Sequence, residues 1–94
     1  MPESDSQADK DVVGRFIQDG RLVIVPSKRA KLRLVLDHIA QDFEPGRNYQ
    51  EPEVNDLLER YHDDYAALRR YLVDEGFLSR EGGVYWRTGG TVEV

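Results

Sequence analysis

The stretch from residue 53 to residue 87 constrains the fold more than any other part of the chain, because three local patterns follow one another in it. Two of them have the spacing of short amphipathic helices. Their inward-facing positions are Val54, Leu57, Leu58 and Tyr61, and then Tyr65, Leu68, Arg69 and Leu72. The third pattern is a pair of apolar runs on either side of Gly82-Gly83, which predicts a β-hairpin.

The link between the two helical patterns contains little more than His62-Asp63, so the helices must form a corner. We therefore predict an α+β fold, a small winged helix-turn-helix. The helix-turn-helix covers residues 52–76 and the wing covers residues 77–87. Pro52 suits a first helical turn, which makes Glu51 the predicted N-cap.

The preceding residues predict an extra N-terminal helix and a short strand. Apolar residues recur at helical spacing before Gly20, and the β-branched run from Arg21 to Pro26 favours a strand. Ser27 is then the predicted cap of a helix that extends to about Asp42. The core-facing positions of that helix are Leu32, Val35, Leu36, Ile39 and Phe43.

A chain of 94 residues has room for one hydrophobic core, so we predict a single domain over residues 10–94. Residues 1–9 are polar and acidic, which predicts a disordered tail. The sequence contains no Cys, and no apolar run approaches the roughly 20 residues of a membrane span. We expect a cytoplasmic protein that does not contact a membrane.

The charge distribution weakens a routine assignment to DNA binding. The net charge is -5. Residues 21–48 carry six bases and three acids, whereas residues 49–76 carry eight acids and three bases. Nucleic-acid-binding domains usually present a basic face, because contacts to phosphates dominate their affinity. Here the predicted helix-turn-helix is the most acidic part of the chain.

Several basic residues are nevertheless candidates for contact with nucleic acid or another anion. Lys28, Arg29 and Lys31 belong to a basic turn at residues 28–33, where free N–H groups of a helix could meet a phosphate. The alternative for this turn is a solvated face, or pairing with the acids of residues 51–64. Arg70 faces outward on the second helix of the corner, and Arg80 and Arg87 lie in the wing.

Arg69 has a different predicted role, because it faces the first helix of the corner. A half-buried arginine needs a carboxylate partner, and we predict a structural ion pair with Glu53 or Asp56. In the wing, one of Tyr85 and Trp86 must point into the core and the other outward.

No catalytic pattern is present in the sequence. It has no nucleophile motif, no glycine-rich phosphate loop and no ligand spacing for a metal. The two histidines, His38 and His62, lie on different elements. We expect neither an enzyme nor a bound cofactor or metal.

The sequence also resembles a known family over about residues 13–87. The matching positions are Pro26, Lys28 and Phe43, then Tyr49, Glu51, Glu53, Val54 and Asn55, then Leu68-Arg69-Arg70 with Leu72 and Val73, and finally Leu78, Arg80, Tyr85 and Arg87. These residues resemble the uncharacterised prokaryotic domain of unknown function numbered 2087. The resemblance implies a winged-helix-like fold that is sometimes part of transcriptional regulators, with no established activity.

Two functional hypotheses follow. In the first, the chain is a transcription-associated module that touches DNA through the basic turn 28–33, Arg70 and the wing. In the second, it is a protein-interaction module, or one that pairs with a second copy as a homodimer, and it does not bind nucleic acid. Charge favours the second hypothesis and the resemblance favours the first.

Overall fold

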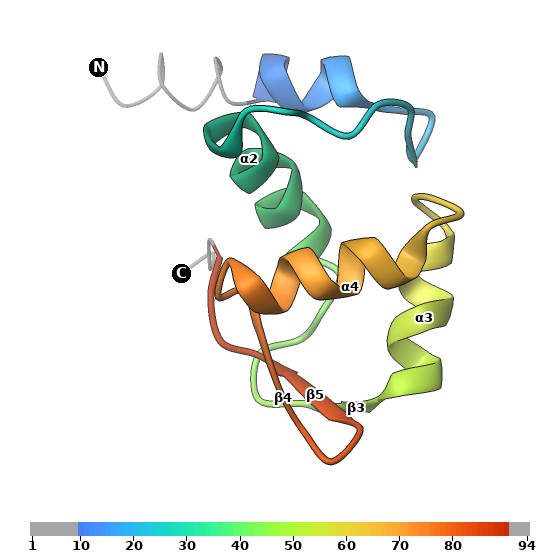
Figure 1. Ribbon diagram of the computed structural model, residues 1–94, viewed down its shortest axis with the longest axis vertical. Coiled ribbons are helices and arrows are strands. Elements are labelled where there is room, and N and C mark those ends of the chain that lie inside the picture. Colours follow the sequence, from blue (N-terminus) through green and yellow to red (C-terminus); the bar gives the residue numbers. More distant parts are fainter. Residues whose placement is uncertain (1–9, 91–94) are drawn as a thin grey trace.

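The computed structural model describes residues 10–90 (Figure 1). The predicted tail at residues 1–9 and the last four residues of the predicted domain lie outside the described residues. The first element of the described residues is a helix, seen at residues 10–16. The elements that follow are β1 (Ile17–Gln18), β2 (Arg21–Leu22), α2 (Arg29–Ala40), β3 (Asn48–Gln50), α3 (Glu51–Glu59), α4 (Tyr65–Asp74), β4 (Leu78–Glu81) and β5 (Val84–Arg87). The predicted α+β class is confirmed.

The core forms where α2, α3, α4 and the hairpin meet. The predicted face of α2 is confirmed, since Val35, Leu36 and Ile39 are fully buried and Leu32 packs against the core from its edge. Phe43 follows the helix and stacks edge-on against Tyr49 of β3, with ring centroids 5.1 Å apart. The buried residues contributed by the second half of the chain are Tyr49, Val54, Leu58, Tyr61, Leu68, Leu72, Phe77, Leu78 and Tyr85.

The predicted hairpin is confirmed, and β3 extends it into a three-stranded antiparallel sheet with the order β3-β5-β4. Gly82 and Gly83 have φ angles of 57° and 83°, as a tight two-residue hairpin turn requires. The pairing of Tyr49 with Tyr85 and of Arg80 with Tyr85 sets the register. Tyr85 is therefore the inward-facing aromatic residue, and Trp86 is only partly buried on the opposite face.

Helices α3 and α4 form the predicted corner, and the N-cap of α3 lies one residue before the predicted position. Gln50, and not Glu51, is the N-cap of α3, because Glu53 Oε1 accepts a hydrogen bond from the Gln50 amide at 3.1 Å. The side chain three residues into the helix thus satisfies the cap amide. At α4 the N-cap is Asp64, whose Oδ1 accepts from Ala67 N at 3.2 Å.

The strand predicted from Arg21 to Pro26 is mostly wrong. Only Arg21 and Leu22 pair, and their partner is the adjacent β1, so the two strands form a minimal hairpin. Val23 donates one more bond to the carbonyl of Phe16 at 2.8 Å, after which the chain lies over α2. The β-branched residues Val23 and Ile24 remain exposed because the two-stranded sheet ends before it reaches them. The cap predicted at Ser27 is also wrong, because α2 begins after Lys28.

Candidate functional site

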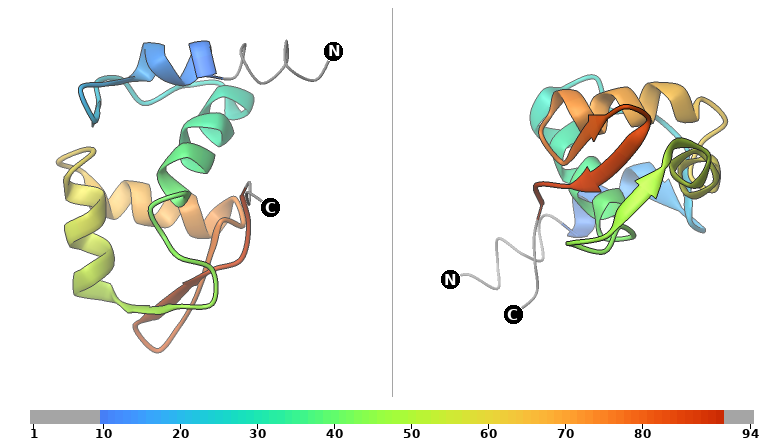
Figure 2. Two further views of the ribbon diagram at one scale, coloured as in Figure 1. Left: turned by 180° about the vertical axis from the view of Figure 1, so that it is seen from behind. Right: turned by 90° about the horizontal axis from the view of Figure 1, so that it is seen from below.

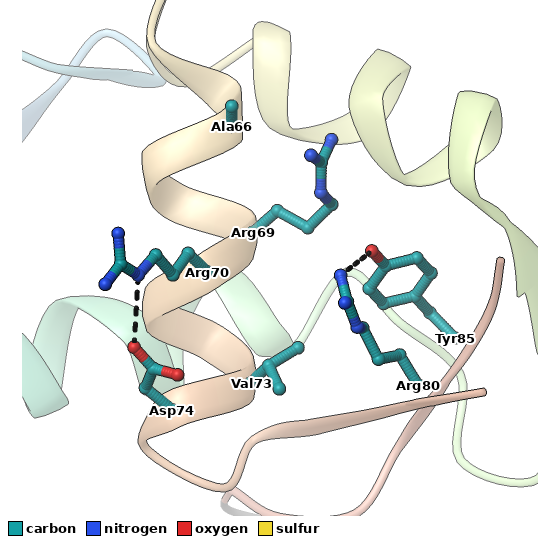
Figure 3. A pocket seen from close by; sticks show the side chains of 7 residues that line it. All are labelled: Ala66, Arg69, Arg70, Val73, Asp74, Arg80 and Tyr85. Atoms are coloured by element: carbon teal, nitrogen blue, oxygen red, sulfur yellow. Dashed lines mark hydrogen bonds and ion pairs between the residues drawn. The ribbon is translucent and has the colours of Figure 1, made fainter. Parts of the chain in front are cut away.

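Three arginines from two elements line one open groove between α4 and the hairpin. Arg69 and Arg70 come from α4, and Arg80 comes from β4. Ala66 and Val73 contribute apolar surface, and Tyr85, which belongs to β5, lines the hairpin side (Figure 3). The groove has a volume of about 430 Å³. Because α4 and the hairpin both pack on the same core, the fold fixes the relative position of these side chains.

Arg69 connects α4 to α3, but through partners other than those predicted. Its Nη1 donates to Asn55 Oδ1, and its Nε lies 3.8 Å from Glu51 Oε1. The predicted partners Glu53 and Asp56 are wrong. Glu53 caps α3 and pairs with Arg47 at 3.3 Å instead. Glu51 and Asn55 are four residues apart, so they share the helical face that is turned toward α4.

The hydroxyl of Tyr85 links Glu51 to Arg80 in the groove. It donates to Glu51 Oε1 at 2.9 Å and accepts a longer bond of 3.4 Å from Arg80 Nη1. This hydrogen bond to Tyr85 raises the pKa of Arg80, which is charged throughout the physiological range. The Tyr85 ring is buried in the core, and its hydroxyl makes the hydrogen bonds at the groove.

Arg70 is the most exposed of the three arginines. Its Nε lies 3.6 Å from Asp74 Oδ2, one helical turn along α4, and the two side chains are 81% and 60% exposed. An ion pair with that exposure is weak and exchanges readily with water or another anion. The Arg70 side chain therefore faces outward, as predicted from its position on the helix.

The comparison with known protein families matches the part of the chain that contains the groove. A family model described as an uncharacterized protein conserved in bacteria (DUF2087) matches residues 21–87. The chain belongs to this family. Neither the curated proteins nor the solved structures contain a match. The match confirms the resemblance found in the sequence. The DUF2087 region begins at β2 and ends with β5, so it includes the whole groove and excludes the helix at residues 10–16.

Some basic residues of the DUF2087 region are already paired with an acid inside the fold. Arg29 Nε and Arg33 Nη1 lie 3.0 and 2.8 Å from the same carboxylate oxygen of Glu75, whose side chain is only 16% exposed. The hydrogen bond from Arg33, and then that from Arg29, lower the pKa of Glu75. These arginines join α2 to the end of α4. Arg29 is therefore paired within the chain, but the partners predicted at residues 51–64 are wrong, because the acid is Glu75.

Arg87 also has a structural role. Its Nη1 donates to the carbonyl of Phe43 at 3.2 Å and its Nε to that of Gly89 at 3.0 Å. The side chain is partly buried and holds the loop after α2 against the end of β5. Contact with nucleic acid through Arg87, as predicted, would require these bonds to break.

Lys28 and Lys31 complete the predicted set, and they lie apart from the groove. They stand at the start of α2, beside the helix at residues 10–16, whereas the hairpin tip lies at the other end of the molecule (Figures 1 and 2). The structure thus divides the six candidate cations. Arg70 and Arg80 share one groove, Lys28 and Lys31 share a second location, and Arg29 and Arg87 are engaged within the fold.

The sequence interpretation missed Glu51 and the Tyr85 hydroxyl as parts of the groove, and it treated Arg69 as purely structural. The hairpin offered a usable signal for one of these residues. A two-residue turn at Gly82-Gly83 places Arg80 directly opposite Tyr85, so these two side chains must lie on the same face of the sheet.

None of the helices between residues 10 and 90 combines the length and the apolar character that crossing a bilayer requires.

Proposed function

We propose that this chain is a winged-helix module that contacts the phosphate backbone of DNA with α4 and the β4–β5 hairpin. The observation that carries the proposal is that Arg69, Arg70 and Arg80 all line one groove. In a helix-turn-helix protein the second helix of the corner enters or borders the major groove, while the adjoining elements contact phosphates. Such a module has no need of a catalytic group and would act in the cytoplasm.

The arrangement of the elements supports this assignment. The order α2, β3, α3, α4 and then a hairpin, with β3 added to its β5 edge, is the one expected for a winged helix. In this arrangement α4 takes the place of the recognition helix and β4–β5 takes the place of the wing. Arg70 and Arg80 then lie on the two elements that would face the DNA.

The charges around the groove define the expected mode of binding. Arg69 and Arg80 both neighbour Glu51, and Arg70 is loosely paired with Asp74. A phosphate can replace Asp74 as the partner of Arg70, because both are anions and the existing pair is exposed. With a net charge of -5 the whole chain repels DNA at long range. Binding should therefore be weak and should depend on few phosphate contacts.

The test is a salt titration of binding to random duplex DNA, followed by fluorescence anisotropy. The wild-type chain should bind at about 50 mM salt and lose affinity steeply by about 200 mM. The double substitution Arg70→Gln with Arg80→Gln should reduce the slope of log K against log salt by about two, because two phosphate contacts are lost.

The matched control is Lys28→Gln with Lys31→Gln, which removes the same charge from the other location. Under the proposal this control keeps the wild-type slope within experimental error. Undetectable binding of the wild-type chain at about 50 mM salt would exclude the proposal, and so would an equal loss in both double variants.

A further inference from the structure

We propose that a second surface, formed by Phe16 and residues 23–31, binds an acidic amphipathic segment of a partner protein. This surface lies at the opposite end of the molecule from the hairpin tip, so the proposal is independent of DNA contact (Figure 2). It combines exposed aliphatic side chains, a groove and two lysines whose charge is not neutralised within the described part of the fold.

The aliphatic side chains are the first reason to expect a partner. Among the residues that the structure describes, Val23 and Ile24 are the large apolar side chains left exposed, at 50% and 63%. They are adjacent in sequence and follow directly after β2. Single exposed apolar residues need no explanation, but a contiguous pair next to a groove is typical of an interaction site.

The groove gives this surface a defined shape. It has a volume of about 290 Å³ and lies between the helix at residues 10–16 and the start of α2. Its apolar walls are formed by Phe16, Ile24, Val25 and Pro26. Its other end is polar and is formed by Ser27, Lys28 and Lys31. A matching ligand is therefore apolar at one end and polar at the other, and the groove is large enough for a single anchoring side chain.

The charge at the polar end identifies what the polar part of the ligand must be. Within residues 10–90, Lys28 and Lys31 form no ion pair, whereas the neighbouring Arg29 is engaged by Glu75. The first turn of α2 contains no acidic residue. The partial positive charge of the helix N-terminus therefore adds to that of the two lysines. This end is complementary to carboxylates that lie close to an apolar anchor.

Charge also argues against a second copy of this chain as the occupant. A two-fold contact through Val23 and Ile24 would bring the same surface patch of both copies together, including Lys28 and Lys31. The four ammonium groups would then repel one another across an apolar contact. An acidic segment satisfies both parts of the surface at once, with an apolar side chain in the groove and carboxylates one helical turn away at the lysines.

The experiment uses the full chain labelled with ¹⁵N and a synthetic amphipathic peptide with Leu on one face and Asp and Glu on the other. Amide shift changes should be confined to Phe16 and residues 23–31, with a Kd of about 1 mM or tighter. A peptide with the same Leu positions and Lys in place of every acid should cause no such changes. The variant Lys28→Gln with Lys31→Gln should weaken binding about fivefold.

Two further variants make the assignment specific. Ile24→Ser, at an exposed position, should also weaken binding, while Arg70→Gln with Arg80→Gln should leave it unchanged. No shift at about 1 mM acidic peptide, or equal binding of the lysine peptide, would overturn the proposal. So would shifts that depend on protein concentration without peptide and disappear in Ile24→Ser, because a second copy would then be the occupant.

Discussion

The cations of this molecule fall into two regions that differ in what surrounds them. On the α2 side and at the end of β5, Arg29, Arg33 and Arg87 meet a carboxylate or backbone carbonyls that the fold delivers to them. On the outer side of α4 and the hairpin, Arg70 and Arg80 have only exposed or weak partners. Residue type alone therefore does not show which cationic side chain is free to bind a ligand. The difference depends on whether the fold already supplies the side chain with a strong hydrogen-bond acceptor.

Substitution of Arg87 should have the largest effect on stability. Arg87→Met removes the donors to the carbonyls of Phe43 and Gly89 and should lower the free energy of unfolding by about 2 kcal/mol. Urea denaturation followed by circular dichroism measures the change. An unchanged midpoint combined with weaker DNA binding would move Arg87 into the group of ligand-binding cations and break the division.

Arg69 should give the next largest effect, because it lines the groove and also has partners on α3 within the fold. Arg69→Met removes the hydrogen bond to Asn55 and the charge near Glu51, at a cost of about 1 kcal/mol in the free energy of unfolding. The same denaturation experiment applies, with Arg70→Met as the matched control. If both variants were equally stable, Arg69 would not hold the corner between α3 and α4.

The pH dependence of stability tests the ion pairs that Glu75 forms with Arg29 and Arg33 of α2. The arginines lower the pKa of Glu75 from 4.5, so the carboxylate stabilises the folded state fully above that value. This contribution disappears as pH falls through the lowered pKa. Glu75→Gln should therefore destabilise the chain at pH 7, by less than Arg87→Met does, and the difference from wild type should close below about pH 4. A difference independent of pH would mean that the arginines do not act through the carboxylate.

The smallest effect on stability is expected for Arg70→Gln with Arg80→Gln. Both side chains are exposed, so the melting temperature should match that of the wild-type chain in calorimetry. A clear loss of stability would show that these arginines belong with Arg29 and Arg87. Their effect on DNA binding would then have to be separated from an effect on folding.

Much of the second half of the fold could be predicted from the sequence, because its determinants are local. The periodicity around Leu68 and Leu72 and the turn at Gly82-Gly83 each specify an element within a few residues. The strand predicted at residues 21–26 failed for the opposite reason. β-branched residues favour a strand only where a neighbouring strand is present, and here that neighbour is two residues long.

The site was harder to predict than the fold because its partners are distant in sequence. Glu75 is 46 residues from Arg29, and Phe43 is 44 residues from Arg87. No local pattern could therefore separate these arginines from the available ones. Arg80 was more accessible to prediction, because the hairpin register alone places it beside Tyr85.

DNA contact through α4 and the hairpin is tested most directly by an amide shift titration of the full ¹⁵N-labelled chain with random duplex DNA at about 50 mM salt. We expect shifts at residues 66–74 of α4 and 78–85 of the hairpin, with none at residues 23–31. Shifts confined to residues 23–31, or no shifts at all, would contradict this prediction.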